Sequence, residues 1–357
     1  MRSRSSAGDA DGPSRKWKFL APPGSRIERA PAPTFSVVVA AYNVADVIGD
    51  ALESLRRQTR PPLEVIVCDD GSTDDLNAAL GPYQDWIALV RKENAGEASA
   101  KNAAAQVARG EFVVILDADD VYLPSRLAAL SELAQVRPDL DILTTDGFLL
   151  ARGEVLRHVY DGSYRFEVDD QRRAILEHNF VFGLAAVRRD LFLRSGGFDE
   201  SILWTTDWDL WLRLILGGAR AGCVDEPLAH YRLRESSLTA RRHELLLGKL
   251  ATLTKTRRNP DLRADERPIL ERSIEQYGRQ LALLELQRAV AAEGRDARAR
   301  ALELARRRGY PLRARLGVAA MAAAPGISRR FLRRREANTW VGAGGIRVTR
   351  SGASAEE

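Results

Sequence analysis

The chain has 357 residues, 45% hydrophobic and 29% charged, enough for one large globular domain with an appendage or for two domains. Lys plus Arg (54) nearly balance Asp plus Glu (49), and the basic excess gathers at the ends, which favours solvated tails or an anionic surface near them over a basic core. Cys68 and Cys223 lie in or beside apolar runs, so the sequence predicts neither a disulfide framework nor a zinc site and favours a reducing cytosol.

The first 33 residues are polar and Pro-rich, and we expect residues 1–33 to be a disordered leader rather than a signal peptide. No segment has the roughly 20 apolar residues that a bilayer span requires. The nearest candidate, 316–327, contains Pro325 and is flanked by arginines. It would either lie in a membrane interface or pack as a small helix on the main domain. A polar tail is expected at 336–357.

From residue 35 onward, short apolar runs alternate with helical patterns. Strands are predicted at 35–42, 63–69, 86–91, 111–117 and 141–146, and helices at 46–57, 74–80, 97–108 and 124–136. This alternation predicts an α/β fold with a mostly parallel central sheet flanked by helices. The main domain is expected at 34–240 and includes a strongly helical segment at 206–216. A helical C-terminal region is expected at 241–335, with helices at 241–256, 264–294 and 296–309.

Polar residues follow each of the first four predicted strands. In chain order they are Tyr42 and Asn43, Asp69 and Asp70, Asn94, and the acids Asp117, Asp119 and Asp120. Ligands of parallel sheets bind beyond the carboxyl ends of the strands, so these side chains are expected to share one edge. The three acids could cap a helix, act as acid and base, or bind a divalent cation, and capping accounts for one of them at most. Oxygen ligands without nearby His or Cys favour Mg²⁺ or Mn²⁺, whose shells phosphate oxygens often complete.

Asp70 ends a predicted strand and precedes a glycine turn and residues 72–74, which can cap the next helix. A carboxylate at a sheet edge can accept an N–H of a nucleobase ring. The sequence contains no Walker loop and no GxGxxG motif, so neither a P-loop nor a dinucleotide-binding fold is expected.

Six stretches, taken in order, resemble the inverting family 2 glycosyltransferases of the GT-A fold over about residues 35–240. They are SVVVAAYN (36–43), VIVCDDGSTD (65–74), ENAGEASAKN (93–102), ILDADD (115–120), GGFDE (196–200) and TDWDLWLRL (206–214). The resemblance implies the GT-A fold of nucleotide-diphospho-sugar transferases. It also implies transfer of a sugar, with inversion, from a nucleotide sugar such as a UDP-sugar to an acceptor hydroxyl, in the synthesis of a cell-surface polysaccharide or glycolipid.

The resemblance further assigns residues to a donor pocket and a metal site. The donor pocket would contain Ala41, Tyr42, Asn43, Asp70, Asn94, Gly96, Lys101, Asp117 and Ala118. Mn²⁺ or Mg²⁺ would be held by Asp119, with Asp117 and Asp120 as further ligands. His230 is either an additional metal or phosphate ligand or a structural residue.

The acceptor side and the general base lie later in the chain. The resemblance places Gly197, Phe198, Trp204 and Trp208 on the acceptor side, where a tryptophan could offer a flat face to a sugar; Trp208 could instead pack between helix and sheet. Asp207 would be the general base, although Thr206 replaces the Glu that the family usually has before it. Asp207 and Asp209 point roughly 200° apart on a helix, so only one of them can serve the site. The start of a helix would favour the ionised form of Asp207.

The partners implied by the resemblance are a nucleotide-sugar donor and a saccharide or lipid-linked acceptor, and no nucleic acid. A cytoplasmic enzyme is expected, with its basic C-terminal region in peripheral contact with the inner face of the plasma membrane. Two alternatives stay open. A sugar nucleotidyltransferase should carry a Gly-rich loop after the first strand, where this chain has AAYNVADV. A catalytically degenerate transferase acting as a binding or scaffold protein is supported by Thr206 alone.

Overall fold

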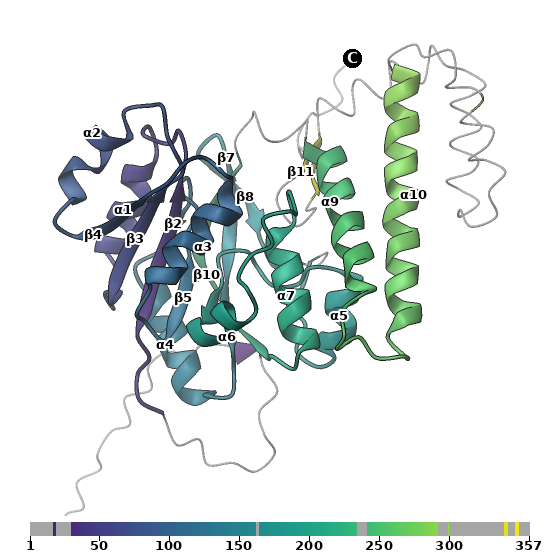
Figure 1. The fold of residues 1–357 in the computed structure, drawn as a ribbon, viewed down its shortest axis with the longest axis horizontal. Coiled ribbons are helices and arrows are strands. Elements are labelled where there is room, and N and C mark those ends of the chain that lie inside the picture. The colour runs from purple at the N-terminus through teal and green to yellow at the C-terminus, as the bar shows by residue number, and fades with distance from the viewer. Residues whose placement is uncertain are drawn as a thin grey trace, which may run out of the picture.

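The computed structural model describes residues 17–18, 30–161, 164–233, 241–291, 299, 339–341 and 347–349 (Figure 1). Its strands are β1 (Trp17–Lys18), β2 (Phe35–Ala41), β3 (Glu64–Asp69), β4 (Ile87–Arg91), β5 (Phe112–Ile115), β6 (Val121–Tyr122), β7 (Ile142–Ala151), β8 (Glu154–His158), β9 (Ala186–Arg188), β10 (Ala221–Leu233), β11 (Thr339–Val341) and β12 (Arg347–Thr349). Its helices are α1 (Ile48–Arg56), α2 (Leu76–Leu80), the 3₁₀ turn η1 (Gly81–Tyr83), α3 (Glu97–Val107), α4 (Arg126–Val136), α5 (Gln171–Glu177), α6 (Arg189–Arg194), α7 (Thr206–Leu216), α9 (Arg241–Thr256) and α10 (Arg267–Ala291).

A ten-stranded sheet forms the centre of the described chain, with the strand order β1-β10-β7-β9-β5-β2-β3-β4 and with β6 on β10 and β8 on β7. Strands β5, β2, β3 and β4 are parallel neighbours. Strand β9 is antiparallel to both β5 and β7, and β7 runs parallel to β10. The sequence therefore predicted the mostly parallel α/β sheet correctly, whereas β9, with only three residues, is too short to give a pattern of its own.

The apolar runs form the strands at the centre of the sheet because they can be buried on both faces. In β2 all seven residues except Ala40 are buried, and in β5 all four are. Continuous burial of this kind is typical of a parallel strand with helices on either side. The edge strand β4, by contrast, contains only partly buried and exposed residues. Together these elements place the carboxyl ends of β2, β3, β4 and β5 at one edge.

The helical C-terminal region begins with α9 and α10, which stand side by side (Figure 1). Helix α9 packs against α7, and α10 packs against α5 as well as α9. The predicted helices at 241–256 and 264–294 are therefore present, the second over 267–291. The segment 316–327 and, apart from residue 299, the predicted helix at 296–309 lie outside the described residues. Within the described part of the chain, no helix combines the length and apolarity that a bilayer crossing needs.

Two segments expected to lack regular structure contain short strands. In the leader, Trp17 and Lys18 pair with Val224 and Cys223 at the free edge of β10. In the tail, β11 and β12 form a two-stranded antiparallel sheet. Both tail strands contain β-branched residues, which favour extended backbone and locally outweigh the polar composition of the segment.

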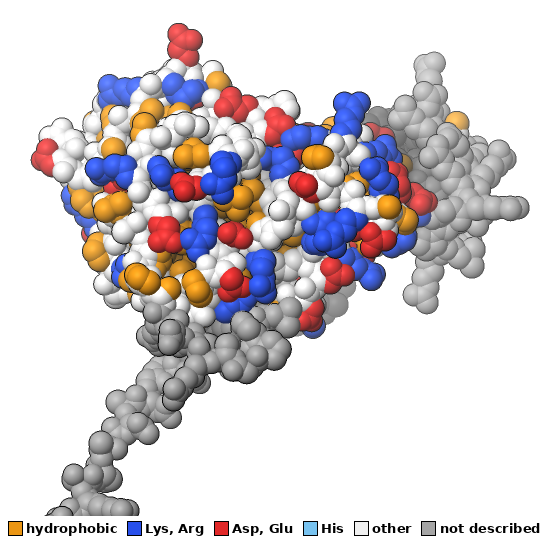
Figure 2. Space-filling view, turned by 60° about the horizontal axis from the view of Figure 1, so that its bottom comes forward, with side chains coloured by type: hydrophobic (Ala, Val, Ile, Leu, Met, Phe, Trp, Pro, Cys, Tyr) orange, Lys and Arg blue, Asp and Glu red, His pale blue; other side chains and the backbone are white. Residues whose placement is uncertain are grey.

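Charged side chains of both signs are spread over one face of the described residues. On the face shown in Figure 2, Lys and Arg are interspersed with Asp and Glu. This mixture agrees with the near balance of charges in the sequence. It differs from the one-sign basic surface that nucleic-acid-binding domains present.

Candidate active site

The end of β3 carries Asp70, whose carboxylate is buried with 2% of the residue exposed. It accepts hydrogen bonds from Lys92 Nζ at 2.7 Å, from the backbone N of Ala95 at 3.1 Å and from that of Gly96 at 2.8 Å. A carboxylate offers about four acceptor positions, so these bonds occupy most of them. Asp70 therefore fixes the turn that leads into α3. One acceptor position of the Asp70 carboxylate remains for the nucleobase contact predicted for it.

The end of β2 places Ala41, Tyr42 and Asn43 beside this turn. The carbonyl of Ala41 accepts the backbone N–H of Asp70 at 2.9 Å. Asn43 adopts a left-handed backbone (φ 52°), and its side-chain oxygen accepts the backbone N–H of Thr73 at 2.8 Å. The side chain of Asn43 thus ties the loops after β2 and β3 together. Tyr42 is exposed, so it presents its ring to solvent at the sheet edge.

Helix α3 begins after Gly96, whose positive φ (95°) suits the turn, and the preceding Asn94 is exposed. One turn into the helix, the buried Lys101 ammonium forms ion pairs with Glu97 and, at 2.6 Å, with Asp117. Burial raises the pKa of Asp117 to about 6, although Lys101 lowers it. The Lys101 ammonium also lies 5.8 Å from the ring centroid of Phe198. Lys101 therefore connects the acidic loop after β5 with the loop before α7.

The acidic loop contains an unsatisfied carboxylate oxygen. Asp120 is buried, and its Oδ1 accepts the backbone N–H of Arg232 at 2.8 Å, whereas its buried Oδ2 has no hydrogen-bond partner. Burial and the charges of Asp117 and Asp119 raise the pKa of Asp120 well above its usual range. Asp119 is half-buried in the same loop, and Ala118, between the acids, is buried. A cation beside these acids would satisfy the orphan oxygen and offset their repulsion.

The carboxylates in this loop suit a hard divalent cation whose remaining ligands are water or phosphate oxygens. In the described part of the chain, no three His, Cys, Asp or Glu side chains are grouped closely enough to hold a metal by themselves. Mg²⁺ is commonly bound through one or two carboxylates, with water and phosphate oxygens completing its shell, and the residues present fit that arrangement. His230, on β10, is half-buried, and burial together with Arg232 lowers its pKa, which favours the neutral ring that can act as a ligand.

The loop between α6 and α7 is fastened to α3 by Asn102. The side-chain amide of Asn102 donates to the carbonyl of Phe198 at 2.9 Å, and its oxygen accepts the N–H of Phe198 at 2.8 Å. Gly197, before it, has a positive φ (70°), and a Cβ at this position would overlap the Asn102 oxygen. Only glycine fits here without a shift of the loop. Phe198 itself is buried, so it supports the loop rather than facing solvent.

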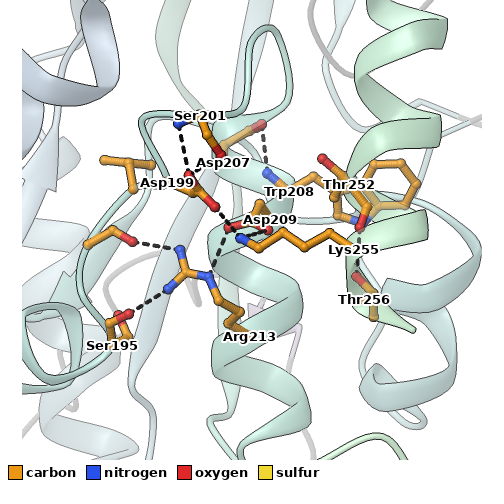
Figure 3. Close-up of polar contacts among 12 residues, drawn as sticks. Ser195, Asp199, Ser201, Asp207, Trp208, Asp209, Arg213, Thr252, Lys255 and Thr256 are labelled. Carbon is orange, nitrogen blue, oxygen red and sulfur yellow. Dashed lines mark hydrogen bonds and ion pairs between the residues drawn. The ribbon is translucent and has the colours of Figure 1, made fainter. Parts of the chain in front are cut away.

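An ion-pair network ties the same loop to α7 and α9 (Figure 3). The Lys255 ammonium of α9 contacts Asp199 Oδ2 at 2.5 Å and Asp209 Oδ1 at 2.7 Å. Arg213 of α7 donates to Asp209 Oδ2 and to the carbonyl of Ser195, both at 2.8 Å. We name Asp199, Asp209, Arg213 and Lys255 the loop clamp. Asp209, which points away from Asp207 as helix geometry requires, therefore serves the clamp.

Asp207 lies in the first turn of α7, and both its carboxylate oxygens accept hydrogen bonds. Oδ1 accepts the backbone N–H of Trp208 at 2.8 Å, and Oδ2 accepts the side-chain amide of Asn179 at 2.9 Å. Burial raises the pKa of Asp207, and these two bonds and the charge of Lys101 lower it without cancelling the effect. Desolvation therefore outweighs the contacts that favour the ionised form of Asp207. A raised pKa makes Asp207 a stronger base.

The two tryptophans predicted on the acceptor side differ in exposure. Trp208 is 1% exposed, its indole N–H donates to the carbonyl of Ile175 at 2.8 Å, and its ring lies edge-on to Tyr277. Trp208 is therefore a packing residue, and the prediction that it faces the acceptor is wrong. Trp204 is 45% exposed and has a positive φ (74°), a rare conformation for a bulky side chain. Trp204 therefore lies at the surface, three residues before Asp207.

Helix α3 joins the donor edge to the acceptor side. Its first turn is held by Asp70, Lys101 pairs with Asp117, and Asn102 grips the loop before α7. The charge of Lys101 also acts on Asp207. Helix α3 thus links the residues that follow β3 and β5 to the loop before α7. Asn179 belongs to no motif of the sequence, and only the structure reveals its contact with Asp207.

A fold of this kind, with a mostly parallel sheet, an acidic loop after a central strand and a helix-borne aspartate, is that of the GT-A glycosyltransferases. The mannosyltransferase PcManGT from Pyrobaculum calidifontis, solved with GDP-Man and Mn²⁺, shares the fold with a TM-score of 0.54 at 23% sequence identity, over 91% of this chain and 88% of that chain. Residues 36–195 match the model for glycosyl transferase family 2.

Individual relatives include proteins of polysaccharide synthesis. The chain is 35% identical over 229 residues to the succinoglycan biosynthesis protein ExoO of Rhizobium meliloti, covering 60% of this chain and 64% of ExoO. It is 24% identical over 216 residues to WfaP of Escherichia coli, named as a UDP-Glc:α-D-GlcNAc-diphosphoundecaprenol β-1,3-glucosyltransferase, covering 59% of this chain and 82% of WfaP. The chain thus spans less than two thirds of the length of ExoO.

Proposed function

We propose that this protein transfers a sugar from a nucleoside diphosphate sugar, preferably a UDP-sugar, to an acceptor hydroxyl with inversion at the anomeric carbon. The observation that carries the proposal is the placement of Asp207. It is a partly buried carboxylate whose pKa is raised by desolvation and lowered by the charge of Lys101, which pairs with Asp117 in the acidic loop. This arrangement supports a site in which a base for the acceptor and acids for the donor diphosphate would act together.

The donor would bind along the edge formed by the ends of β2 and β3 and the start of α3. The exposed ring of Tyr42 can contact the nucleobase, and the Asp70–Lys92 pair supplies an acceptor and a donor at the same edge. Asn94 and Gly96 line the turn that Asp70 holds. Asp117 would face the ribose and diphosphate. Asp119 and Asp120, with His230 as a further candidate, would hold Mn²⁺ or Mg²⁺, and a bound divalent cation would neutralise charge developing on the diphosphate.

Asp207 would act on the opposite side of the sugar. The acceptor oxygen forms a bond to the anomeric carbon while the bond from that carbon to the diphosphate oxygen breaks, and the electron pair leaves with the nucleoside diphosphate. Asp207 takes the proton of the acceptor hydroxyl. Attack from the face opposite the leaving group inverts the anomeric configuration, and general-base catalysis of this kind contributes about 10²–10⁴-fold. The loop at Gly197 and Phe198, and the exposed ring of Trp204, would bound the acceptor.

The acceptor we propose is a saccharide, free or linked to a lipid diphosphate, in the synthesis of a cell-surface polysaccharide or glycolipid. The names of ExoO and WfaP support this class of pathway and of acceptor. The setting we propose is the inner face of the plasma membrane, where a lipid-linked acceptor would be reached. The basic C-terminal segment that would contact the membrane falls outside the described residues.

A panel of nucleotide sugars, tested with and without Mn²⁺, examines this proposal. One UDP-sugar at 100 times its Kd should stabilise the protein by about 2.7 kcal/mol in thermal unfolding, and EDTA should reduce that gain. With a saccharide acceptor, the same donor should yield a product of inverted anomeric configuration by NMR, together with free nucleoside diphosphate. Binding of the donor without any transfer would instead support a degenerate transferase. Retention of configuration would contradict the proposed role of Asp207.

A further inference from the structure

The segment between α5 and β9 delivers one side chain to the carboxylate of Asp207. Asn179 is buried with 7% of the residue exposed, and its side-chain Nδ2 donates to Asp207 Oδ2 at 2.9 Å. Its side-chain oxygen accepts the backbone N–H of Val181 at 3.4 Å. A carboxylate only accepts, so the amide must turn its NH₂ group toward Asp207, and the bond to Val181 is consistent with that orientation.

The backbone that carries Asn179 is held on both sides. Tyr160 donates its hydroxyl to the carbonyl of Phe180 and accepts the N–H of Phe182, both at 2.9 Å. Ahead of Asn179, the hydroxyl of Tyr277 donates to the carbonyl of Glu177 at 3.2 Å. These bonds restrict the segment, so the Asn179 amide meets Asp207 in one geometry.

Around the Asp207 carboxylate, the contacts other than Asn179 come from its own helix and from a glycine. Oδ1 takes the N–H of Trp208 from its own helix, and the neighbouring Gly183 has no side chain; a Cβ there would lie 3.4 Å from Oδ2. Asn179 is thus the side chain that fixes how the carboxylate is turned about its χ angles. A base must meet its proton within hydrogen-bond reach and with suitable alignment.

We propose that Asn179 is a positioning residue that orients the carboxylate of Asp207 toward the acceptor hydroxyl. This inference rests on the proposed role of Asp207 as the base. The Asn179 amide donates to the ionised carboxylate, and so it favours the form of Asp207 that can take a proton. It does not touch the sugar or the diphosphate and acts through Asp207 alone.

The ionisation of Asp207 also responds to charges on every element that faces it. Lys101 lowers its pKa and Glu97 raises it, both from α3. Lys249 of α9 and Tyr164, in the segment before α5, interact with it electrostatically as well. Removal of Asn179 leaves all four of these groups in place, so a change in the titration of Asp207 in such a variant reports the lost hydrogen bond.

The test is a pH titration of Asp207 by ¹³C NMR of protein labelled at the aspartate side-chain carboxyls. The resonance missing in Asp207→Asn identifies Asp207. In Asn179→Ala its midpoint should rise by about one pH unit, the shift expected when an ionised group loses a hydrogen bond. Gln58→Ala is the matched control, because Gln58 is also 7% exposed and its buried amide bonds to Leu123 and Leu127, away from Asp207. Its Asp207 midpoint should equal that of the wild type.

Kinetics of nucleoside diphosphate release, with the nucleotide sugar that the wild type uses, complete the test. Asn179→Ala should lower kcat about tenfold with an unchanged KM for the donor, equivalent to a barrier increase of about 1.4 kcal/mol. Asn179→Asp keeps nearly the same shape but replaces the amide that donates to Asp207 with a second carboxylate, so it should raise the titration midpoint of Asp207 further. An unchanged midpoint in either folded variant, or a raised midpoint with unchanged kcat, overturns the inference. Loss of the proposed function would show separately, as full turnover by Asp207→Asn.

Discussion

Lys255 offers the sharpest test of how the C-terminal helices support the acceptor side. In Lys255→Met the apolar stem of the side chain is retained and the ammonium is lost, so Asp199 and Asp209 each lose a contact. Asp209 is buried and keeps Arg213, whereas Asp199 keeps only its bonds to Ser201. The substitution therefore loosens the loop clamp at its junction with α9 and leaves Asp207 untouched.

The size of the effect follows from the burial of the partners. A hydrogen bond to a charged group is worth about 1.5–3 kcal/mol when a buried partner is left without it, and solvent screens the part of the pair that is exposed. Since the Lys255 side chain is 39% exposed, we expect a loss of about 2 kcal/mol in the free energy of unfolding, or about 5 °C in Tm. The control Arg257→Met has a similarly exposed side chain (44%) but an exposed partner, Glu271, and should lower the free energy of unfolding by clearly less than Lys255→Met does.

The stability that is lost in Lys255→Met should depend on pH, in a direction set by the pKa of Asp199. Burial alone would raise the pKa of Asp199, but hydrogen bonds from Lys255 and Ser201 hold it at about 2. A lowered carboxylate pKa contributes stability above the unfolded value of about 4, and the contribution fades as the pH falls toward 2. The gap in Tm between wild type and Lys255→Met should therefore be full at neutral pH and narrow on acidification.

Thermal unfolding and amide hydrogen exchange of residues 195–203 are the assays. In Lys255→Met the amides of this loop should exchange faster, the KM for the acceptor should rise, and affinity for the nucleoside diphosphate should stay the same. Equal exchange in this loop, or a stability loss no larger than that of Arg257→Met, would refute the reasoning.

Three further substitutions test other parts of the site. Gly197→Ala forces a Cβ onto the Asn102 oxygen at a positive φ and should lower the free energy of unfolding by about 2 kcal/mol. Gly196→Ala also has a positive φ but open space around the Cβ, so it should lower the free energy of unfolding by about 1 kcal/mol, and urea unfolding measures the difference. Asp120→Asn removes a buried acid whose pKa is raised, so without metal the Tm of this variant should exceed that of the wild type at pH 8, and the gain should vanish at low pH. Stabilisation of the variant by Mn²⁺ with nucleoside diphosphate should weaken. A Tm below that of the wild type at pH 8 would contradict this prediction. Burial lowers the pKa of Lys249 to about 8, so the stability of the wild type should rise between pH 8 and about 10. Lys249→Met should therefore raise the Tm more at pH 7 than at pH 10. An equal change in Tm at both pH values would contradict this prediction.

The parts of the fold that sequence predicts best are those set by local pattern. The buried runs of β2 and β5, and the helix at 206–216, carry their periodicity within single segments. Because β2, β3, β4 and β5 are parallel, the polar residues after each strand share an edge, and that consequence could be predicted as well. Strand β9 could not be, since three residues carry no pattern and its pairing with β5 and β7 is decided by tertiary contacts.

The candidate site shows the same division. The acidic loop and Asp207 were predicted from motifs, but the partners of those residues come from distant parts of the chain. Asn179 lies 28 residues before Asp207 and Lys255 lies 46 residues after Asp209, so no local spacing indicates either contact. The burial of Trp208 was not decided by helical spacing either, because α5 and α10 supply the surfaces that cover it. The sequence motifs predicted which chemical groups form the candidate site, whereas tertiary packing determines the contacts around each of them.

The central claim is that Asp207 removes the proton of the acceptor hydroxyl and takes no part in binding the nucleotide-sugar donor. The most direct measurement is the steady-state rate of nucleoside diphosphate release, with donor and acceptor saturating, for wild type, Asp207→Asn and the exposed-acid control Asp190→Asn. The account predicts that Asp207→Asn loses at least about 10²-fold in kcat while its donor Kd stays the same, and that Asp190→Asn matches the wild type. A kcat for Asp207→Asn equal to that of the wild type would contradict the account.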